Sequence, residues 1–355
     1  MLKGVTAAAG VDLRVEDGVG RRCIEFIEPG RVLLSRRDVL YEAPSPDAAP
    51  RRIGSFPVPA WKRAAAAARP AQRALRFMYY NVLPLHDGSI FLTFGTSAGV
   101  WRDGAIVPLR GIVRPSRVLR SGAALGSDGA VYFGEYLDNA ERGVMRVYRY
   151  SAGSDGVEVV HAFAPGEVRH VHGIYADPFD GSLWCLSGDV AGECRVMRTS
   201  DGFRTLDVVG SGDESWRTVS LQFSADAVFY AMDAEHTQNH LMRIDRRTGQ
   251  RTSIGPVGGP VYYSAAAGGQ LFFGVTAELC PSQAEPQAEL WCVDPASERH
   301  RRVATLRKDV YNVRYFMPGT IDFARGPRDG ARLFFRATAL AGDGRTFSLP
   351  VPVSM

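Results

Sequence analysis

Short runs in which apolar and polar side chains alternate recur along the chain, and Asp-Gly or Gly-Gly pairs separate many of them. Alternation with a period of two is typical of β-strands. Residues 170–213 follow the order strand, turn, strand, loop, strand, turn, strand, and residues 219–258 and 261–306 repeat it. The pattern predicts consecutive four-stranded antiparallel sheets, each of about 40–50 residues.

About seven such units fit the chain, so we predict an all-β fold, a seven-bladed β-propeller, with six or eight blades as the alternative. The last unit, residues 310–355, supplies only three convincing strands. We expect the N-terminal segment near residues 5–13 to join this last blade as its fourth strand, which leaves no free sheet edge. A pair of β-sandwiches is the competing fold, but a sandwich has no reason to repeat one turn order so regularly.

One segment breaks the repeat. Residues 44–76 are rich in Pro, Ala and Arg, and the run WKRAAAAAR within them has high helical propensity. We interpret this segment as a helical insertion between the first and second blades of a single domain spanning residues 1–355, with Pro70 ending or kinking the helix.

Composition limits the classes of function. The formal net charge of +4 is modest and no block of like charges stands out, so we expect no nucleic-acid partner. No stretch approaches the roughly 18 apolar residues of a membrane span. Residues 1–9 lack the apolar core of a signal peptide, which predicts a cytoplasmic protein, or an exported one if a leader was trimmed. The five cysteines lack CxxC spacing and are expected to be thiols.

Known nucleotide-binding and hydrolase motifs are missing from the sequence. There is no P-loop, no GxGxxG between a strand and a helix, no GxSxG and no HExxH. Their absence argues against nucleotide, dinucleotide, serine-hydrolase and zincin functions.

The loops sort by face, because antiparallel order puts the first-to-second and third-to-fourth connections of every blade on one side. That side carries only simple turns, such as those at Ser127 and Asp177. The other side carries the between-blade and second-to-third connections, where we expect a functional mouth of the propeller channel. The polar and aromatic candidates there are Tyr80, Glu135, Asp189, Trp216, Arg217, Asp233, His236, Asn239, Tyr262, Glu278 and Arg314, with Lys62, Arg63 and Arg69 of the insertion.

His170 and His172 are the sharpest local signal. Residues two apart on a strand point the same way, so both imidazoles would address one place. The pair suits a divalent metal with a third ligand from another blade, or a general base beside an orienting partner. A structural histidine, hydrogen-bonded in the channel, is the alternative.

The other candidates suggest carbohydrate chemistry. Arg217 could hold a carboxylate through two parallel hydrogen bonds, and Tyr262 could donate a proton or stack on a sugar. Glu135, Asp189, Asp233 and Glu278 close the second strands of successive blades. Facing carboxylates serve glycoside hydrolysis, and His, Tyr and Arg together serve β-elimination on a uronic acid.

Residues 199–205, Thr-Ser-Asp-Gly-Phe-Arg-Thr, are similar to the Asp-box turn S/T-x-D-G-G-x-T-W, with Phe203 in place of the second Gly and Leu206 in place of the Trp. A fainter copy lies at residues 151–158. With residues 169–189, this turn resembles the sialidase-like (BNR-repeat) β-propellers of bacteria, mostly of undefined function. An Asp-box is a structural turn away from the active centre, so it bears on fold more than activity.

The resemblance implies some site roles. Arg217 would be one of the three arginines that bind the sugar carboxylate in sialidases, and Tyr262 with Glu278 would mimic their Tyr–Glu pair. The chain departs from sialidases in its blade count and in lacking recognisable counterparts of the other two arginines. Seven-bladed propellers of similar pattern include polysaccharide lyases that use His, Tyr and Arg.

We therefore predict a carbohydrate-active enzyme, a glycoside hydrolase or polysaccharide lyase, acting on an acidic oligosaccharide or polysaccharide. A non-catalytic glycan- or protein-binding propeller and a lactonase-type metal propeller are the alternatives. The residues assigned to catalysis are His170, His172, Asp233, Tyr262 and Glu278. Those assigned to substrate binding are Tyr80, Glu135, Asp189, Trp216, Arg217, His236, Asn239 and Arg314.

Overall fold

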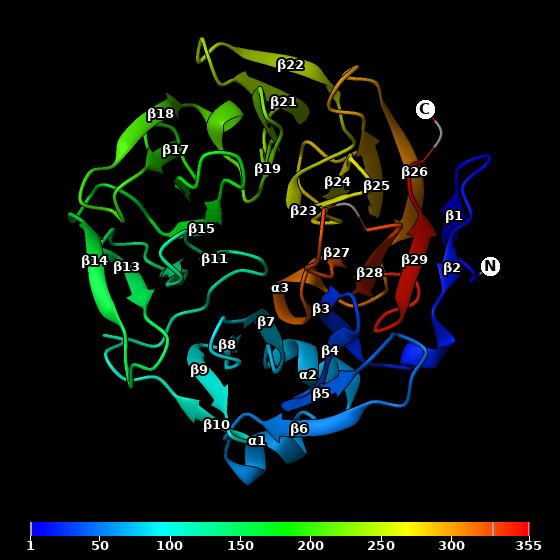
Figure 1. Cartoon of the computed structure of the whole chain (residues 1–355). Helices are drawn as coiled ribbons and strands as arrows, with labels where there is room; N and C mark the ends of the chain where they lie inside the picture. The colour runs from blue at the N-terminus through cyan, green and yellow to red at the C-terminus, as the bar shows by residue number, and fades with distance from the viewer. Residues whose placement is uncertain (1, 329, 354) are drawn as a thin grey trace. The chain divides into compact units, whose positions relative to one another are not determined.

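The computed structural model describes residues 2–328, 330–353 and 355, and nearly all of its regular structure is β-strand. Its strands form seven antiparallel sheets, six of four strands and one of five (Figure 1). The chain is a seven-bladed β-propeller, which confirms the fold predicted from the spacing of strands and turns.

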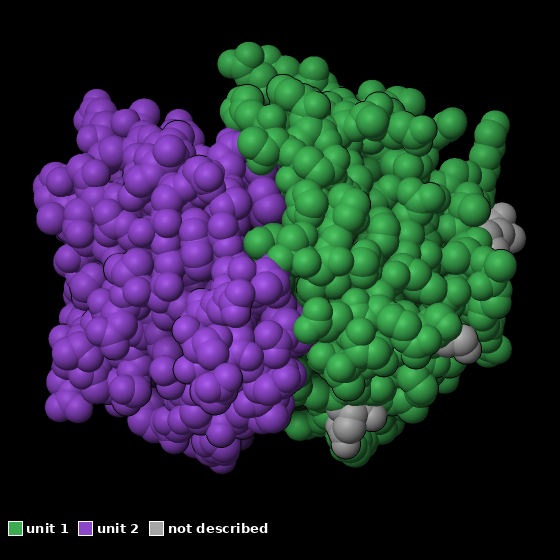
Figure 2. All heavy atoms as spheres, turned by 90° about the horizontal axis from the view of Figure 1, so that it is seen from above, with its two compact units in different colours: residues 1–78, 235–242, 253–355 green, residues 79–234, 243–252 purple. Residues whose placement is uncertain are grey.

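Contacts are densest within two compact units, coloured separately in Figure 2. Unit 1 comprises residues 1–78, 235–242 and 253–355, and unit 2 comprises residues 79–234 and 243–252. The single domain expected from the sequence therefore stays a prediction, and each unit is described by itself.

Unit 2 contains the sheets of the second, third and fourth blades. Their second strands are buried along their whole length, whereas their fourth strands are largely exposed, so the core lies against the inner strands. The strands are β7 (Tyr79–Pro84), β8 (Ile90–Phe94), β9 (Ser97–Arg102) and β10 (Ala105–Pro108); β11 (Ala123–Leu125), β12 (Val131–Gly134), β13 (Met145–Tyr150) and β14 (Glu158–Phe163); β15 (Val171–Ala176), β16 (Leu183–Ser187), β17 (Cys194–Thr199) and β18 (Asp207–Gly212).

The fifth blade keeps the same strand order. It consists of β19 (Leu221–Phe223), β20 (Ala227–Ala231), β21 (His240–Asp245) and β22 (Arg251–Pro256), and the short helix η2 (Glu214–Trp216) precedes it.

Unit 1 contains the sheets of the first, sixth and seventh blades. The helix α3 (Val313–Phe316) precedes the seventh. The strands are β3 (Cys23–Glu28), β4 (Arg31–Arg36), β5 (Val39–Ala43) and β6 (Arg51–Ser55); β23 (Val261–Ala267), β24 (Gln270–Val275), β25 (Gln287–Val293) and β26 (His300–Arg307); β27 (Thr320–Phe323), β28 (Arg332–Thr338) and β29 (Thr346–Pro350).

The N-terminal segment supplies strands to two of these sheets. β2 (Arg14–Val15) pairs with β29 and is the fourth strand of the last blade, as predicted, although it lies just beyond the expected residues 5–13. Within that expected range, β1 (Val5–Ala7) instead pairs with β26 as a fifth strand of the sixth blade. A short η1 helix (Asp17–Val19) then leads into β3.

The helical insertion is shorter than predicted. Residues 51–55, inside the expected range of 44–76, form β6, the fourth strand of the first blade. Two separate helices follow, α1 (Ala60–Ala65) and α2 (Arg69–Ala74). Pro70 lies in the first turn of α2, where a missing N–H costs nothing, rather than at the end of α1.

None of the helices among the described residues is long and apolar enough to cross a membrane. All five cysteines are free thiols, as expected, and four of them are buried.

Candidate functional site

Two histidines and one aspartate of the fourth blade, all in unit 2, converge on one point. His170 precedes β15, His172 is its second residue, and Asp189 follows β16, the strand paired with β15. The His170 Nε2 atom lies 3.1 Å from the His172 Nε2 atom. The Asp189 Oδ1 atom lies 3.0 Å from the first and 3.1 Å from the second. The two imidazoles thus address the same place, as their spacing predicts.

The backbone fixes the orientation of both rings. The Nδ1 atom of His172 lies 2.9 Å from the carbonyl oxygen of Thr218, and that of His170 lies 3.3 Å from the carbonyl oxygen of Leu137. A carbonyl oxygen only accepts hydrogen bonds, so these contacts favour the tautomers with the proton on Nδ1. Each Nε2 atom then turns a lone pair toward the Asp189 oxygen, a contact that becomes favourable only with a proton or a cation between the atoms. Backbone carbonyls commonly hold metal-binding histidines in this way.

The charges around Asp189 keep it ionised. Burial raises the pKa of its carboxyl, but a proton carried on the Nε2 atom of His170 or His172 donates to the carboxylate, outweighs burial and holds that pKa well below its usual range. Burial lowers the pKa of His170 despite its contact with Asp189. Arg169 adds an ion pair of 3.1 Å between its Nη1 atom and the Asp189 Oδ2 atom.

The three donor atoms form a nearly equilateral triangle with sides of 3.0–3.1 Å. A cation about 2.1 Å from each donor would see them at angles of about 90–95°, which is one face of an octahedron. The described residues contain one group of three such side chains whose ligand atoms all lie within 4.8 Å of one another, and it is this one. The third donor, however, comes from the same blade as the histidines, not from another blade as predicted.

Arg217 and Asp233 stand beside this cluster. The Arg217 Nε atom lies 3.1 Å from the Asp233 Oδ2 atom, and its Nη1 atom donates to the Asp189 carbonyl oxygen at 3.4 Å. Both side chains are buried. The two carboxylates that Arg217 contacts in this structure belong to the protein, Asp233 at 3.1 Å and Asp189 at 3.6 Å, so Arg217 positions the loop that carries Asp189.

Trp216, the neighbour of Arg217, has a packed ring. The ring lies against Gly210, where a Cβ atom would come within 2.1 Å of it. The guanidinium of Arg251 covers the ring at 3.9 Å from its centroid. These contacts give Trp216 a packing role in the fourth and fifth blades.

Glu135 is fully buried and its carboxylate is already engaged. The Tyr148 hydroxyl donates to its Oε1 atom at 2.8 Å, and Arg114 Nη2 donates to its Oε2 atom at 3.0 Å. Arg146 lies close by, with a 3.6 Å ion pair. The structure therefore gives Glu135 an internal role in the third blade, and its predicted contact with substrate stays a prediction. Tyr80 is likewise buried, at 5% exposure.

The remaining predicted residues lie in unit 1. The Tyr262 hydroxyl donates to the Glu278 Oε1 atom at 2.5 Å, so these two predicted residues contact each other. Asn239 is buried and its amide donates to the Ser282 hydroxyl at 3.1 Å. His236 and Arg314 are exposed, the latter on α3. Their roles in binding or catalysis stay predictions.

Sequence reasoning missed two aspects of the cluster. Asp189 was assigned to substrate rather than to the histidines, and Arg169 and Tyr136 were not assigned at all. Tyr136 stacks beside His170, with ring centroids 4.2 Å apart. A usable signal existed for Asp189, because a hairpin that pairs Val171 with Ser187 returns the chain to the histidines just after β16.

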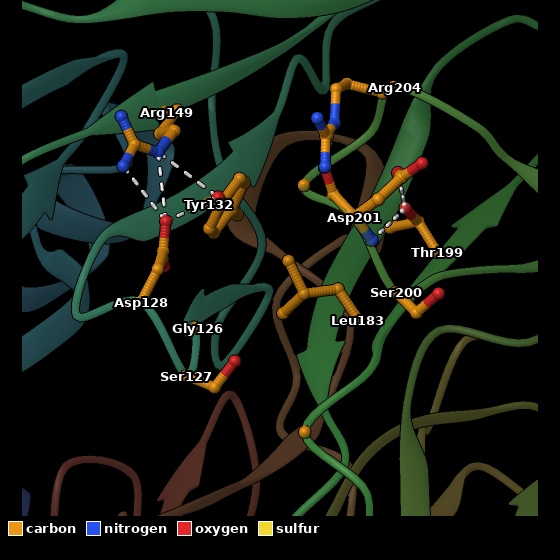
Figure 3. Close-up of a pocket in the computed structure, with 12 residues that line it drawn as sticks. Gly126, Ser127, Asp128, Tyr132, Arg149, Leu183, Thr199, Ser200, Asp201 and Arg204 are labelled. Carbon is orange, nitrogen blue, oxygen red and sulfur yellow. Dashed lines mark hydrogen bonds and ion pairs between the residues drawn. The ribbon is translucent and has the colours of Figure 1, made fainter.

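A pocket of about 360 Å³ lies on the side of unit 2 that was expected to carry only simple turns. The first-to-second turns at Ser127 and Gly181 line it with the third-to-fourth turn of the fourth blade (Figure 3). Arg149 donates there to Asp128 and also to Glu158. Its guanidinium is therefore used within the blade, and we assign the pocket no ligand.

No family model and no curated protein matches this sequence. Solved structures resemble it in fold. An oligogalacturonate lyase from Vibrio parahaemolyticus matches with a TM-score of 0.61 and 10% identity over 98% of this chain and 97% of its own. A chain of a mitotic checkpoint complex matches with a TM-score of 0.57 and 11% identity over 99% of this chain and 94% of its own.

The extracellular domain of a protein described as a one component system, from B. thetaiotaomicron, matches with a TM-score of 0.55 and 11% identity. The match covers 99% of this chain but spans only 40% of the other. At such identities these similarities show the propeller fold alone.

Proposed function

We propose that this protein is a carbohydrate-active enzyme that uses a divalent cation, held by His170, His172 and Asp189, to act on an acidic saccharide. The observation that carries the proposal is the triangle of two imidazole nitrogens and one carboxylate oxygen with sides of 3.0–3.1 Å. Two imidazoles and a carboxylate suit Mn²⁺, Fe²⁺, Co²⁺ or Zn²⁺ better than Ca²⁺ or Mg²⁺.

An acidic saccharide fits this arrangement for a chemical reason. A cation beside a uronate carboxylate neutralises its charge and thereby makes the neighbouring C–H proton more acidic. Arg169, at 34% side-chain exposure, is the most accessible cation on Asp189; its second partner, Asp138 at 2.8 Å, is 80% exposed, so an anionic ligand arriving from solvent can replace that contact. Arg217 and Asp233 support the Asp189 loop from the buried side.

Between hydrolysis and elimination, we favour elimination, and oligogalacturonate is the first substrate to test. The fold similarity to an oligogalacturonate lyase motivates this choice of substrate. Tyr262, hydrogen-bonded to Glu278 within unit 1, stays a predicted proton-transfer group independently of the cation site.

The test begins with metal binding. Chelator-stripped protein is titrated calorimetrically with Mn²⁺ and Zn²⁺, using wild type, His172→Asn and the control His86→Asn. His172 is buried, whereas His86 lies exposed in a turn. We expect stoichiometric binding by wild type and His86→Asn, and affinity weakened by at least about 100-fold in His172→Asn.

Activity is then followed on oligogalacturonate and other acidic oligosaccharides, through unsaturated uronate absorbance and through new reducing ends. We expect turnover that chelation abolishes and added metal restores. The absence of metal binding in wild type would overturn the cation site. A binding propeller would be favoured if the protein binds metal without turnover and His172→Asn still binds saccharide as the wild type does. Turnover of lactones alone would favour the lactonase type.

A further inference from the structure

Two neighbouring cavities in unit 1 are lined mainly by arginines. The smaller has a volume of about 80 Å³ and the larger about 480 Å³, and both are bounded by Arg36 and Arg37 of the β4–β5 turn. The smaller is also lined by Arg21, Arg69 and Arg336, and the larger by Arg52 and Arg63. These residues come from the first and seventh blades and from the helices α1 and α2 (Figure 1).

The lining carries far more positive than negative charge. Seven arginines face two aspartates, Asp38 and Asp343, so five positive charges are in excess. That local excess is larger than the formal net charge of +4 of the whole chain. Both aspartates are already paired, Asp38 with Arg63 at 2.8 Å and Asp343 with Arg69 through two contacts of 2.9 and 3.0 Å.

Arg336 is the most informative member of this arginine cluster. It lies on β28 with only 8% of its surface exposed. Its Nε atom has no hydrogen-bond partner, and among the residues that the structure describes its guanidinium makes no ion pair. The Nε atom of Arg37 is also buried without a partner. Burying an unpaired charge costs several kcal/mol, so such a group normally has an anion beside it.

The local backbone keeps these groups around an open space. The Arg336 Nη2 and Arg69 Nε atoms each lie 3.6 Å from the position that a Cβ atom on Gly344 would occupy. Arg37 adopts a left-handed backbone with φ of 58°, an uncommon conformation for a residue with a side chain, and donates to the Arg63 carbonyl oxygen. Burial, followed by the like charge of Arg336, lowers the pKa of Arg69, although its contact with Asp343 opposes this.

We propose that this arginine cluster binds a phosphate or sulfate group. The group would occupy the smaller cavity, beside Arg336, Arg37 and Arg69, with Arg21 and Arg36 at its rim. A cavity of about 80 Å³ compares with about 30 Å³ for one water molecule, so it suits a single small oxyanion. Guanidinium groups offer several fixed N–H donors to a tetrahedral anion. The larger cavity would take the remainder of a phosphate or sulfate ester.

A doubly charged oxyanion neutralises more of the excess positive charge than a carboxylate does. No residue of this cluster takes part in the proposed cation site, so the two proposals stand or fall separately.

The test uses the full chain with inorganic phosphate, sulfate or acetate as the added anion. Chloride keeps the ionic strength the same in every sample. Binding is measured by calorimetry and by the thermal midpoint, in wild type, Arg336→Met, Arg36→Gln and the control Arg204→Gln. Arg36 and Arg204 are both exposed, but Arg204 lies in unit 2. We expect saturable stabilisation by phosphate or sulfate in wild type and Arg204→Gln, loss of it in Arg336→Met, and at least about fivefold weaker binding in Arg36→Gln.

Without phosphate, Arg336→Met should be at least as stable as wild type, because it removes an uncompensated buried charge. If that variant fails to fold, Arg36→Gln still decides the question. Glucose 6-phosphate and glucose 6-sulfate then distinguish a phosphate ester from a sulfate ester. Three results would overturn the proposal. Phosphate could raise the thermal midpoint of the wild type no more than chloride does, or acetate could bind as tightly as phosphate. Phosphate binding could also be undiminished in both Arg36→Gln and Arg336→Met.

Discussion

The substitution Glu135→Gln separates the role predicted for Glu135 from the role that the structure gives it. The carboxylate has no exposed surface and accepts hydrogen bonds from Tyr148, Arg114 and the backbone N–H of Arg146. Glutamine keeps the size of the side chain but removes its charge. Its NH₂ group also cannot accept from the donors on one side of the carboxylate.

Removing one partner of a buried ion pair costs about 3–5 kcal/mol. Arg114 and Arg146 are 30% and 23% exposed, so water can solvate part of the charge left behind and the lower half of that range is expected. With an unfolding entropy of about 2.1 cal/mol/K per residue, a loss of about 3–4 kcal/mol lowers the thermal midpoint of a chain of this length by about 4–5 °C if it unfolds as one unit.

Glu158→Gln is the matched control. Glu158 also pairs with an arginine of β13, at 2.6 Å, but its side chain is 59% exposed. An exposed pair contributes at most about 1 kcal/mol, so this midpoint should fall by about 1 °C or less. Both variants are compared by calorimetry and by urea unfolding. Equal midpoints for the two variants, with saccharide binding lost only in Glu135→Gln, would refute our reasoning and restore the substrate role.

Two further predictions concern single contacts. Tyr262→Phe removes the hydrogen bond that the hydroxyl donates to Glu278 and should lower the free energy of unfolding by about 1.5 kcal/mol; an unchanged free energy of unfolding in urea would contradict this role. Backbone and side-chain hydrogen bonds from Thr205 lower the pKa of Asp201 from 3.8 to about 2, so its contribution to stability is present above pH 4 and is lost as the pH falls through 2. The stability difference between wild type and Asp201→Asn in urea should accordingly shrink between pH 4 and 2, and a difference that grows there would contradict this assignment.

The fold was predictable because every blade repeats the same local turns and the same alternation of apolar and polar residues along its strands. Strand β6 was missed for a physical reason. It is the outermost strand of its blade, and its first residues, Arg51 and Arg52, are exposed, so no apolar alternation marks it. The strand that completes the last blade is only two residues long and is defined by its partner β29 rather than by its own sequence.

The candidate site was predictable to the extent that it is local. The spacing of His170 and His172 predicts that their side chains point the same way, and the pairing of β15 with β16 predicts that Asp189 lies near them. Burial is not local, so the sequence does not show that Glu135 is enclosed and already hydrogen-bonded to Tyr148 and Arg114. Its position after a second strand is the same as that of Asp189, yet Glu135 is fully buried and Asp189 keeps 12% of its side chain exposed.

The arginine cluster shows most clearly that sequence patterns predict only local features. No run of like charge marks the arginine cluster in the sequence, because its residues are scattered from position 21 to position 336. A propeller collects such residues because each blade returns its connections to the same edge of its sheet, so distant loops of one unit become neighbours. The local excess of five positive charges disappears in the net charge, since acidic residues elsewhere offset it. A buried arginine without a partner is therefore better evidence for an anion than the charge of the whole chain, and Arg336 is the residue on which that inference depends.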